Sequence, residues 1–315
     1  MPAYLIKHIT RYSYPSPVID SANQVMLFPP DDAHQEVKKH ELHITHQPSV
    51  EVFTDYFGNR VGLFSVIRPH TELRIESVIE VITHSPSLPD QMMAAESQWD
   101  NLNIVKDQFP YMDFLSRESC DCEPEMAEVV TACMGDNITP FQAAEKMSGY
   151  VYRHFAYQKG ITSVETRVDE IWKLKAGVCQ DFAHILLVML RMVGIPSRYV
   201  SGYICPKNHE FRGEGATHAW VEAYIPFHGW IGLDPTNNCI AGDKHVRLAV
   251  GRHFTDCTPV KGTYKGSSEH SLEVSVVIGN GEPGQPEAPV FSYQVHNPAL
   301  PDNSYRRFME MQQQQ

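Results

Sequence analysis

The chain has 315 residues, of which 42% are hydrophobic and 20% are charged, and its formal net charge is −12 at pH 7. These values are ordinary for a soluble globular enzyme, and the length suits one large domain or two smaller ones. The negative charge argues against general nucleic-acid binding, which requires a basic surface. No window approaches the roughly 18 uninterrupted apolar residues of a membrane-spanning helix, so we expect neither nucleic acid nor a membrane as a partner.

The N-terminus and the cysteines indicate a compartment. The first residues, from Met1 to His8, lack the basic region and the long apolar stretch of a secretory signal. The seven cysteines are an odd number, are scattered and form no repeated framework. We therefore expect a cytoplasmic protein with free thiols, since a reducing environment keeps cysteines unpaired.

The N-terminal part of the chain has the pattern of β-structure. Apolar and polar residues alternate from Thr71 to Thr83, as they do in a half-buried strand. The pair Gly58 and Asn59 separates two apolar runs and predicts a hairpin. Several such strands with short turns predict an antiparallel β-sandwich-like domain over residues 1-86, which ends in a proline-containing linker.

The periodicity becomes helical after this linker. Thr139, Pro140 and Gln142 have the spacing of an N-cap, a first helical residue and the partner in a capping box. We therefore predict a second domain, residues 87-280, with a helical first part, and an α+β fold class. Residues 281-315 are rich in proline and glycine near their start, and we expect them to form a C-terminal tail.

Cys179 stands immediately before an apolar stretch with helical periodicity, which ends at Gly194. At the first turn of a helix the backbone N–H groups have no intrahelical partner and the helix dipole favours negative charge. A thiol in that position is favoured as a thiolate. Gly177, two residues earlier, would permit close approach of the backbone to a ligand. On residue type alone, however, a free cysteine is usually an inert, buried small hydrophobe.

A histidine and an aspartate follow on a predicted hairpin, since residues 218–234 read as a strand, a turn and a returning strand. If Tyr224 pairs with His228, then His218 lies opposite Asp234, and the side chains of opposed residues project from the same face of the sheet. The carboxylate would then accept the Nδ1–H of the imidazole, fix its tautomer and stabilise its cationic form.

Each of these residues also has a simpler interpretation, because the chain has 16 histidines and because Asp-Pro is common in turns. Their order and matching contexts nevertheless favour a triad of Cys179, His218 and Asp234. The surrounding sequence resembles the transglutaminase-like superfamily, in particular its bacterial branch with an N-terminal β domain. The resemblance rests on these segments: Gly177–His184, Arg198–Tyr203, His218–Glu222 and Gly229–Thr236, with Asp55–Asn59 and Gly251–Asp256 as further matches.

The resemblance implies a papain-like core in which a helix carrying the cysteine packs on an antiparallel sheet carrying the histidine and the aspartate. It implies that Cys179 is the nucleophile, that His218 is the general base and then the acid, and that Asp234 orients the imidazole. The expected reaction is attack on a peptide or other amide bond, with a thioester intermediate. We expect no cofactor and no metal, and the sequence predicts no oligomeric state.

The oxyanion of such a reaction needs hydrogen-bond donors. The backbone N–H of Cys179 is one, and the candidates for a side-chain donor are Gln180, Tyr157 and Trp172.

Three other activities remain open. An amine could replace water in resolving the thioester, which would make the protein a transamidase. A non-catalytic binding module is disfavoured by the intact triad, and a zinc hydrolase is disfavoured because the sequence shows no ligand cluster.

Two further groups of residues are expected to be structural. Cys120 and Cys122, with Cys133, have the wrong spacing for a zinc knuckle and read as an ordinary loop. Arg252 and Asp256 have the spacing for an ion pair that braces the sheet carrying the histidine and the aspartate. Neither group enters the expected chemistry.

Overall fold

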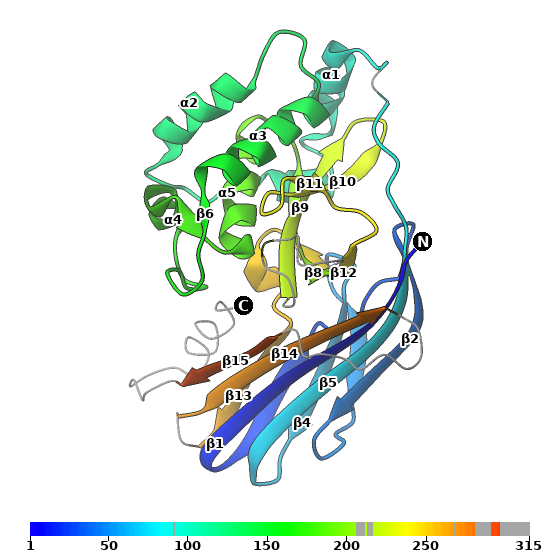
Figure 1. Ribbon diagram of the computed structural model, residues 1–315, viewed down its shortest axis with the longest axis vertical. Coiled ribbons are helices and arrows are strands. Elements are labelled where there is room, and N and C mark those ends of the chain that lie inside the picture. Colours follow the sequence, from blue (N-terminus) through cyan, green and yellow to red (C-terminus); the bar gives the residue numbers. More distant parts are fainter. Residues whose placement is uncertain (91, 206–211, 213–216, 267–268, 281–290, 297–315) are drawn as a thin grey trace.

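The computed structural model describes residues 1–315 apart from 91, 206–211, 213–216, 267–268, 281–290 and 297–315. Figure 1 shows a curled β-sheet that begins the chain and, above it, a mixed unit of helices and a second sheet. The predicted α+β class and the antiparallel N-terminal sheet are confirmed. Among the described residues, no helix is both long enough and apolar enough to cross a membrane.

The N-terminal sheet is built around one long strand, β1. Its first five strands are β1 (Ala3–Val25), β2 (Gln35–Ile44), β3 (Glu51–Thr54), β4 (Arg60–Val66) and β5 (His70–Thr83). The first half of β1 pairs with β5, and after an irregularity between Ser13 and Val18 its second half pairs with β4. One strand therefore contributes to both sides of the curled sheet, whose inward-facing apolar side chains form a single core.

Three strands near the C-terminus complete this sheet. β13 (Val260–Lys265) and β14 (Ser271–Asn280) pair with β1, and β15 (Phe291–His296) pairs with β14. The boundary that we predicted at residue 280 is therefore corrected, because strands on either side of it belong to the N-terminal sheet. Alternation identifies a strand but not its partner, so the sequence could not reveal this return. The rest of the predicted tail, 281–290 and 297–315, lies outside the described residues.

The helices are α1 (Ala95–Val105), α2 (Glu123–Cys133), α3 (Pro140–His154), α4 (Val168–Leu174) and α5 (Cys179–Met192), with short 3-10 turns at Tyr111–Leu115 and Phe254–Asp256. α3 begins with the predicted capping box, in which Thr139 Oγ1 accepts the Gln142 N–H and Gln142 Oε1 accepts the Thr139 N–H. α5 is central, since it packs against α2, α3, α4 and the second sheet. Gly194, with φ of +80°, follows its end as predicted.

The second sheet is antiparallel and has the order β11-β10-β9-β8-β12. Its strands are β8 (Ser197–Ile204), β9 (Thr217–Ile225), β10 (Gly229–Asp234), β11 (Cys239–Ile240) and β12 (His245–Gly251). A short parallel pair, β6 (Ala156–Tyr157) and β7 (Ala176–Gly177), lies before α5. Asn59, in the turn before β4, exchanges two 2.8 Å hydrogen bonds with the backbone of Val250 on β12. The N-terminal sheet is thereby fixed to the sheet that carries the predicted histidine and aspartate.

Candidate active site

Cys179 is the first residue of α5 and is buried, with 5% of its surface exposed. The turn before it is held by Asp181, whose Oδ2 accepts the Val178 N–H and the Thr162 hydroxyl, each at 2.7 Å. A Cβ on Gly177 would lie 2.4 Å from the same oxygen. The Asp181 side chain therefore requires a glycine at this position, whereas the close approach of a ligand to Gly177 stays a prediction.

His218 on β9 and Asp234 at the end of β10 meet as predicted, because His218 Nε2 lies 2.8 Å from Asp234 Oδ2. The predicted register was wrong by two residues, since Tyr224 pairs with Trp230 and not with His228. Ile225 is fully buried and pairs with Gly229, so the turn is formed by residues 226–228 and His228 does not pair with Tyr224. A shift of two leaves each side chain on its predicted face.

The ring nitrogen that is hydrogen-bonded to the carboxylate also differs from the prediction. Asp234 accepts a hydrogen bond from Nε2 of His218, whereas we expected Nδ1 to be the donor. Nδ1 is buried and has no geometrically ideal hydrogen-bond partner among the described residues, but the Cys179 thiol is close enough to interact with the ring. The proton on Nε2 therefore faces the aspartate, and Nδ1 is the nitrogen left to exchange a proton with the sulfur.

Asp234 is completely buried and accepts hydrogen bonds from four other donors besides His218. Its Oδ1 accepts the backbone N–H groups of Thr236 and Asn237, at 2.9 and 3.2 Å. Its Oδ2 accepts Asn237 Nδ2 at 2.8 Å and His245 Nε2 at 3.2 Å. These donors compensate for the loss of water around the buried charge.

The protonation of His245 follows from its other nitrogen. Its Nδ1 lies 3.2 Å from the backbone nitrogen of Gly242, which can only donate. Nδ1 is therefore an acceptor, and the proton of the neutral ring sits on Nε2 and points at Asp234. Burial lowers the pKa of His245 despite the neighbouring carboxylate, and this favours the neutral ring. Our sequence reasoning missed His245 because it lies outside the hairpin, eleven positions after Asp234.

The electrostatics of the pair favour a cationic imidazole and an ionised carboxylate. Burial alone would discharge His218, but the charge of Asp234 and its hydrogen bond outweigh burial and raise the pKa of His218 to about 10. Burial likewise opposes the charge of Asp234, and the His218 and His245 rings hold the pKa of that carboxyl far below its usual range. At neutral pH His218 is therefore cationic and carries a proton on both ring nitrogens.

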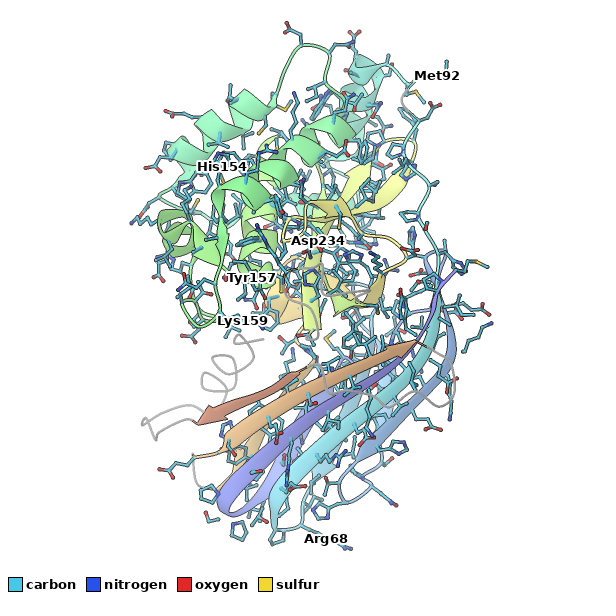
Figure 2. The ribbon with its side chains drawn as sticks, in the orientation of Figure 1. Arg68, Met92, His154, Tyr157, Lys159 and Asp234 are labelled. Carbon is cyan, nitrogen blue, oxygen red and sulfur yellow. The ribbon has the colours of Figure 1, made fainter. Side chains whose placement is uncertain are left out.

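The three oxyanion candidates occupy different positions. Gln180 is the second residue of α5 and is buried. Tyr157 on β6 is half-buried; burial and the charges of Cys179, Asp181 and Asp234 raise the pKa of its hydroxyl, which places it at the triad. Figure 2 labels Tyr157 on β6 and Asp234 at the end of β10, whose charge acts on the Tyr157 hydroxyl. Trp172 differs, because its only N–H is donated to Glu125 Oε2 at 2.9 Å.

Two groups of side chains among the described residues have donor atoms close enough to hold a metal ion. One is His218, Asp234 and His245, and the other is Cys120, Cys122 and Asp169, so the expectation that the chain lacks a ligand cluster was wrong. In the first group both imidazole N–H donors are hydrogen-bonded to the carboxylate itself, and the triad geometry already accounts for the arrangement. The predicted Arg252–Asp256 ion pair is present, with 3.1 Å between Nε and Oδ2.

Comparison with known proteins supports the same interpretation. Residues 127–235 match the model of the transglutaminase-like superfamily, and residues 4–82 match the bacterial transglutaminase-like N-terminal region. An uncharacterised protein of Mycobacterium leprae is 31% identical over 278 residues, which are 87% of this chain and 97% of that protein.

Two further relatives differ in how much of the chain they cover. A solved structure from Cytophaga hutchinsonii, whose protein is only provisionally named a cysteine protease, has a TM-score of 0.70 at 19% identity and covers 91% of this chain and 93% of its own. It therefore shares the fold. A protein-glutamine gamma-glutamyltransferase of Pseudomonas aeruginosa is 31% identical over 157 residues, which are 48% of this chain and 22% of that protein.

Proposed function

The chain belongs to the transglutaminase-like superfamily, and on this premise we propose that it is a thiol acyl-transfer enzyme that hydrolyses peptide or other amide bonds. The observation that carries the proposal is the 2.8 Å contact between His218 Nε2 and Asp234 Oδ2, with Nδ1 left for Cys179. This is the arrangement by which an oriented imidazole activates a nucleophile.

The proposed reaction begins from the charged pair, in which the proton of the Cys179 thiol has already passed to Nδ1 of His218. The thiolate attacks the amide carbonyl carbon, and the N–H of Cys179 at the start of α5 stabilises the oxyanion. Tyr157 is the side-chain donor that we favour, because it is half-buried at the triad and its hydroxyl makes no hydrogen bond to any residue that the structure describes. The amine leaves with the proton from His218, a thioester remains, and water activated by the same imidazole resolves it.

A second candidate function is transamidation, in which an amine replaces water in the last step. The relative from Pseudomonas aeruginosa, named a protein-glutamine gamma-glutamyltransferase, favours it, because it is 31% identical to this chain over 157 residues. The two activities share every step up to the thioester. Only access of water or amine to that intermediate separates them.

The proposed substrate is a peptide or another amide, with neither nucleic acid nor a membrane as a partner. We also propose a cytoplasmic setting, since all seven cysteines are unpaired and a nucleophilic thiol requires a reducing environment. Cell fractionation would test this part, and recovery of the native protein outside the cytoplasm would contradict it.

The decisive experiment incubates the protein with a library of peptides and amides, with and without an added primary amine. Mass spectrometry of the intact protein should detect an acyl adduct on Cys179, and analysis of the products should detect free acid or a new amide. The matched control is Cys179→Ala, which removes the nucleophile and leaves α5 intact. Turnover by this variant at the wild-type rate would rule out the proposed mechanism. Absence of any adduct or product across the library would favour a non-catalytic binding module.

A further inference from the structure

Two cysteines that the proposed reaction does not use lie in contact with each other. The Sγ atoms of Cys120 and Cys122 are 3.0 Å apart. This is closer than the roughly 3.5–4.0 Å of ordinary non-bonded contacts and only about 1 Å longer than a disulfide bond. All seven cysteines lie in the described part of the chain, and no other pair of them is joined by a hydrogen bond between sulfur atoms.

The turn that carries the two thiols is held in place from α4. Asp169 Oδ1 accepts the backbone N–H of Cys122 at 2.9 Å, and one turn further along α2 Glu125 accepts the Trp172 indole N–H at 2.9 Å. Asp169 thereby satisfies a backbone donor at the start of α2. Because the backbone is fixed by these contacts and not by the thiols, the sulfur atoms can change their bonding while the turn stays anchored.

We propose that Cys120 and Cys122 form an oxidisable dithiol, which a low-molecular-weight disulfide such as oxidised glutathione converts to an intramolecular disulfide. One cysteine sulfur attacks the external disulfide, forming a mixed disulfide and releasing one equivalent of the reduced thiol. The second cysteine sulfur then attacks the first and releases the other equivalent. Two protein thiols are oxidised, one external disulfide is reduced to two thiols, and the two protein protons end on the released thiols.

The environment assigns different roles to the two sulfur atoms. The Cys122 thiol donates the hydrogen bond that joins the two sulfur atoms, and Cys120 Sγ accepts it. Cys122 is also the more deeply buried, with 5% of its surface exposed against 9% for Cys120. Cys120 is therefore the residue expected to meet the oxidant, and Cys122 is expected to resolve the mixed disulfide.

Together with Asp169, the two cysteines form a group of three potential metal ligands. A bound thiophilic cation would be a different explanation for the close thiols. The oxygen that Asp169 directs at the turn is already occupied by the Cys122 N–H, and Asp169 Oδ2 lies 3.6 Å from Arg167. A carboxylate committed to these donors is a poor third ligand, which is why we favour the disulfide.

The test uses the Cys179→Ala chain, so that the nucleophile cannot react with the oxidant. After treatment with oxidised glutathione, free thiols are alkylated and the protein is cut after glutamates. Because Pro124 protects the Glu123 bond, one fragment, Ser119–Glu125, contains both cysteines and no other. It should be recovered unalkylated and about 2 Da lighter than the dithiol, and prior reduction should restore double alkylation. In a Cys122→Ser variant, Cys120 should instead retain glutathione.

Cys133→Ser is the matched control, because it removes another buried cysteine from α2 and should leave the mass change intact. Double alkylation of Ser119–Glu125 after oxidation would overturn the proposal, as would a disulfide that joins this fragment to the one containing Cys133. About one zinc ion per chain in the purified protein, lost in Cys122→Ser, would also overturn it in favour of a metal site. None of these readouts depends on the enzymatic activity proposed above.

Discussion

The Nε2 atom of His245 lies 3.2 Å from Oδ2 of Asp234, the carboxylate oxygen that also accepts His218. The Gly242 N–H fixes the His245 tautomer, so a backbone amide, a neutral imidazole, the carboxylate and the second imidazole form one oriented chain. Its far end is the His218 Nδ1 that is left for Cys179. The Gly242 N–H thus sets the tautomer of His245, and the Asp234 carboxylate directs the Nε2–H of His218 away from the sulfur.

Replacing His245 by leucine should lower the free energy of unfolding and change the titration of His218. The change leaves the Gly242 N–H and one Asp234 acceptor position unpaired, which should cost about 1–3 kcal/mol of unfolding free energy. With one donor fewer on Asp234, the titration midpoint of His218 should rise, as followed by NMR of the labelled ring. His245→Gln, which keeps a side-chain N–H, is the matched control and should lie closer to wild type in both measurements. An unchanged His218 midpoint in the leucine variant would show that His245 is only a packing residue.

The reactivity of Cys179 should depend on Asp234. At pH 6–7 an unperturbed thiol is mostly protonated, whereas a cationic His218 beside Cys179 favours the thiolate. We therefore expect iodoacetamide to label Cys179 faster than the other six cysteines of the chain. Asp234→Asn should slow this labelling by about tenfold or more, because it removes the charge that keeps His218 protonated. Peptide mapping of timed samples measures both rates, and equal labelling of all cysteines would contradict an activated thiol.

The contribution of the His218–Asp234 pair to stability should disappear at high pH. The pKa of His218 is raised in the folded protein to about 10, above the unfolded value of about 6.5. The associated stabilisation is therefore complete below about pH 6.5 and is lost as the pH rises towards 10. The pKa of Asp234 is depressed, so the same interaction is also lost in acid, as the pH falls below the unfolded value of about 4.

The measurement compares urea unfolding of the wild type and Asp234→Asn across this range. The difference in unfolding free energy should be largest near pH 6 and should shrink towards pH 10. The exposed substitution Asp100→Asn, on α1, serves as a control for a general loss of negative charge. A difference that stays constant from pH 6 to 10 would mean that the carboxylate does not hold the proton on His218.

Local chemistry was predictable from the sequence, whereas contacts between distant segments were not. The capping box at Thr139, the helix that begins at Cys179 and the shared face of His218 and Asp234 all follow from residue type and short-range spacing. The hairpin register failed because burial of Ile225 in the core, which periodicity does not report, decides where the turn begins. The faces survived this error because a shift of two residues conserves them.

The return of β13 and β14 to the N-terminal sheet and the role of His245 have the same explanation. Both depend on which segment lies beside which, and strand pairing between distant segments leaves no periodic signal. The close thiols of Cys120 and Cys122 were likewise dismissed on spacing, since zinc-knuckle spacing was the pattern sought. His245 is the first residue of β12, and in a chain with 16 histidines that position alone does not indicate a residue of the active site.

The contact between the two sheets should be a measurable part of the stability, because the Asn59 side chain makes two of the hydrogen bonds that join them. Its side chain donates to the Val250 carbonyl and accepts the Val250 N–H, both at 2.8 Å, and Asn59 is 6% exposed. Asn59→Ala would leave a buried backbone donor and acceptor of β12 unpaired, which should lower the unfolding free energy by about 2–4 kcal/mol. Asn103→Ala, at an exposed position of α1, is the control and should change it by less than about 0.5 kcal/mol. Urea unfolding followed by circular dichroism measures both variants, and equal small changes would mean that the two Asn59 hydrogen bonds do not stabilise the contact between the sheets.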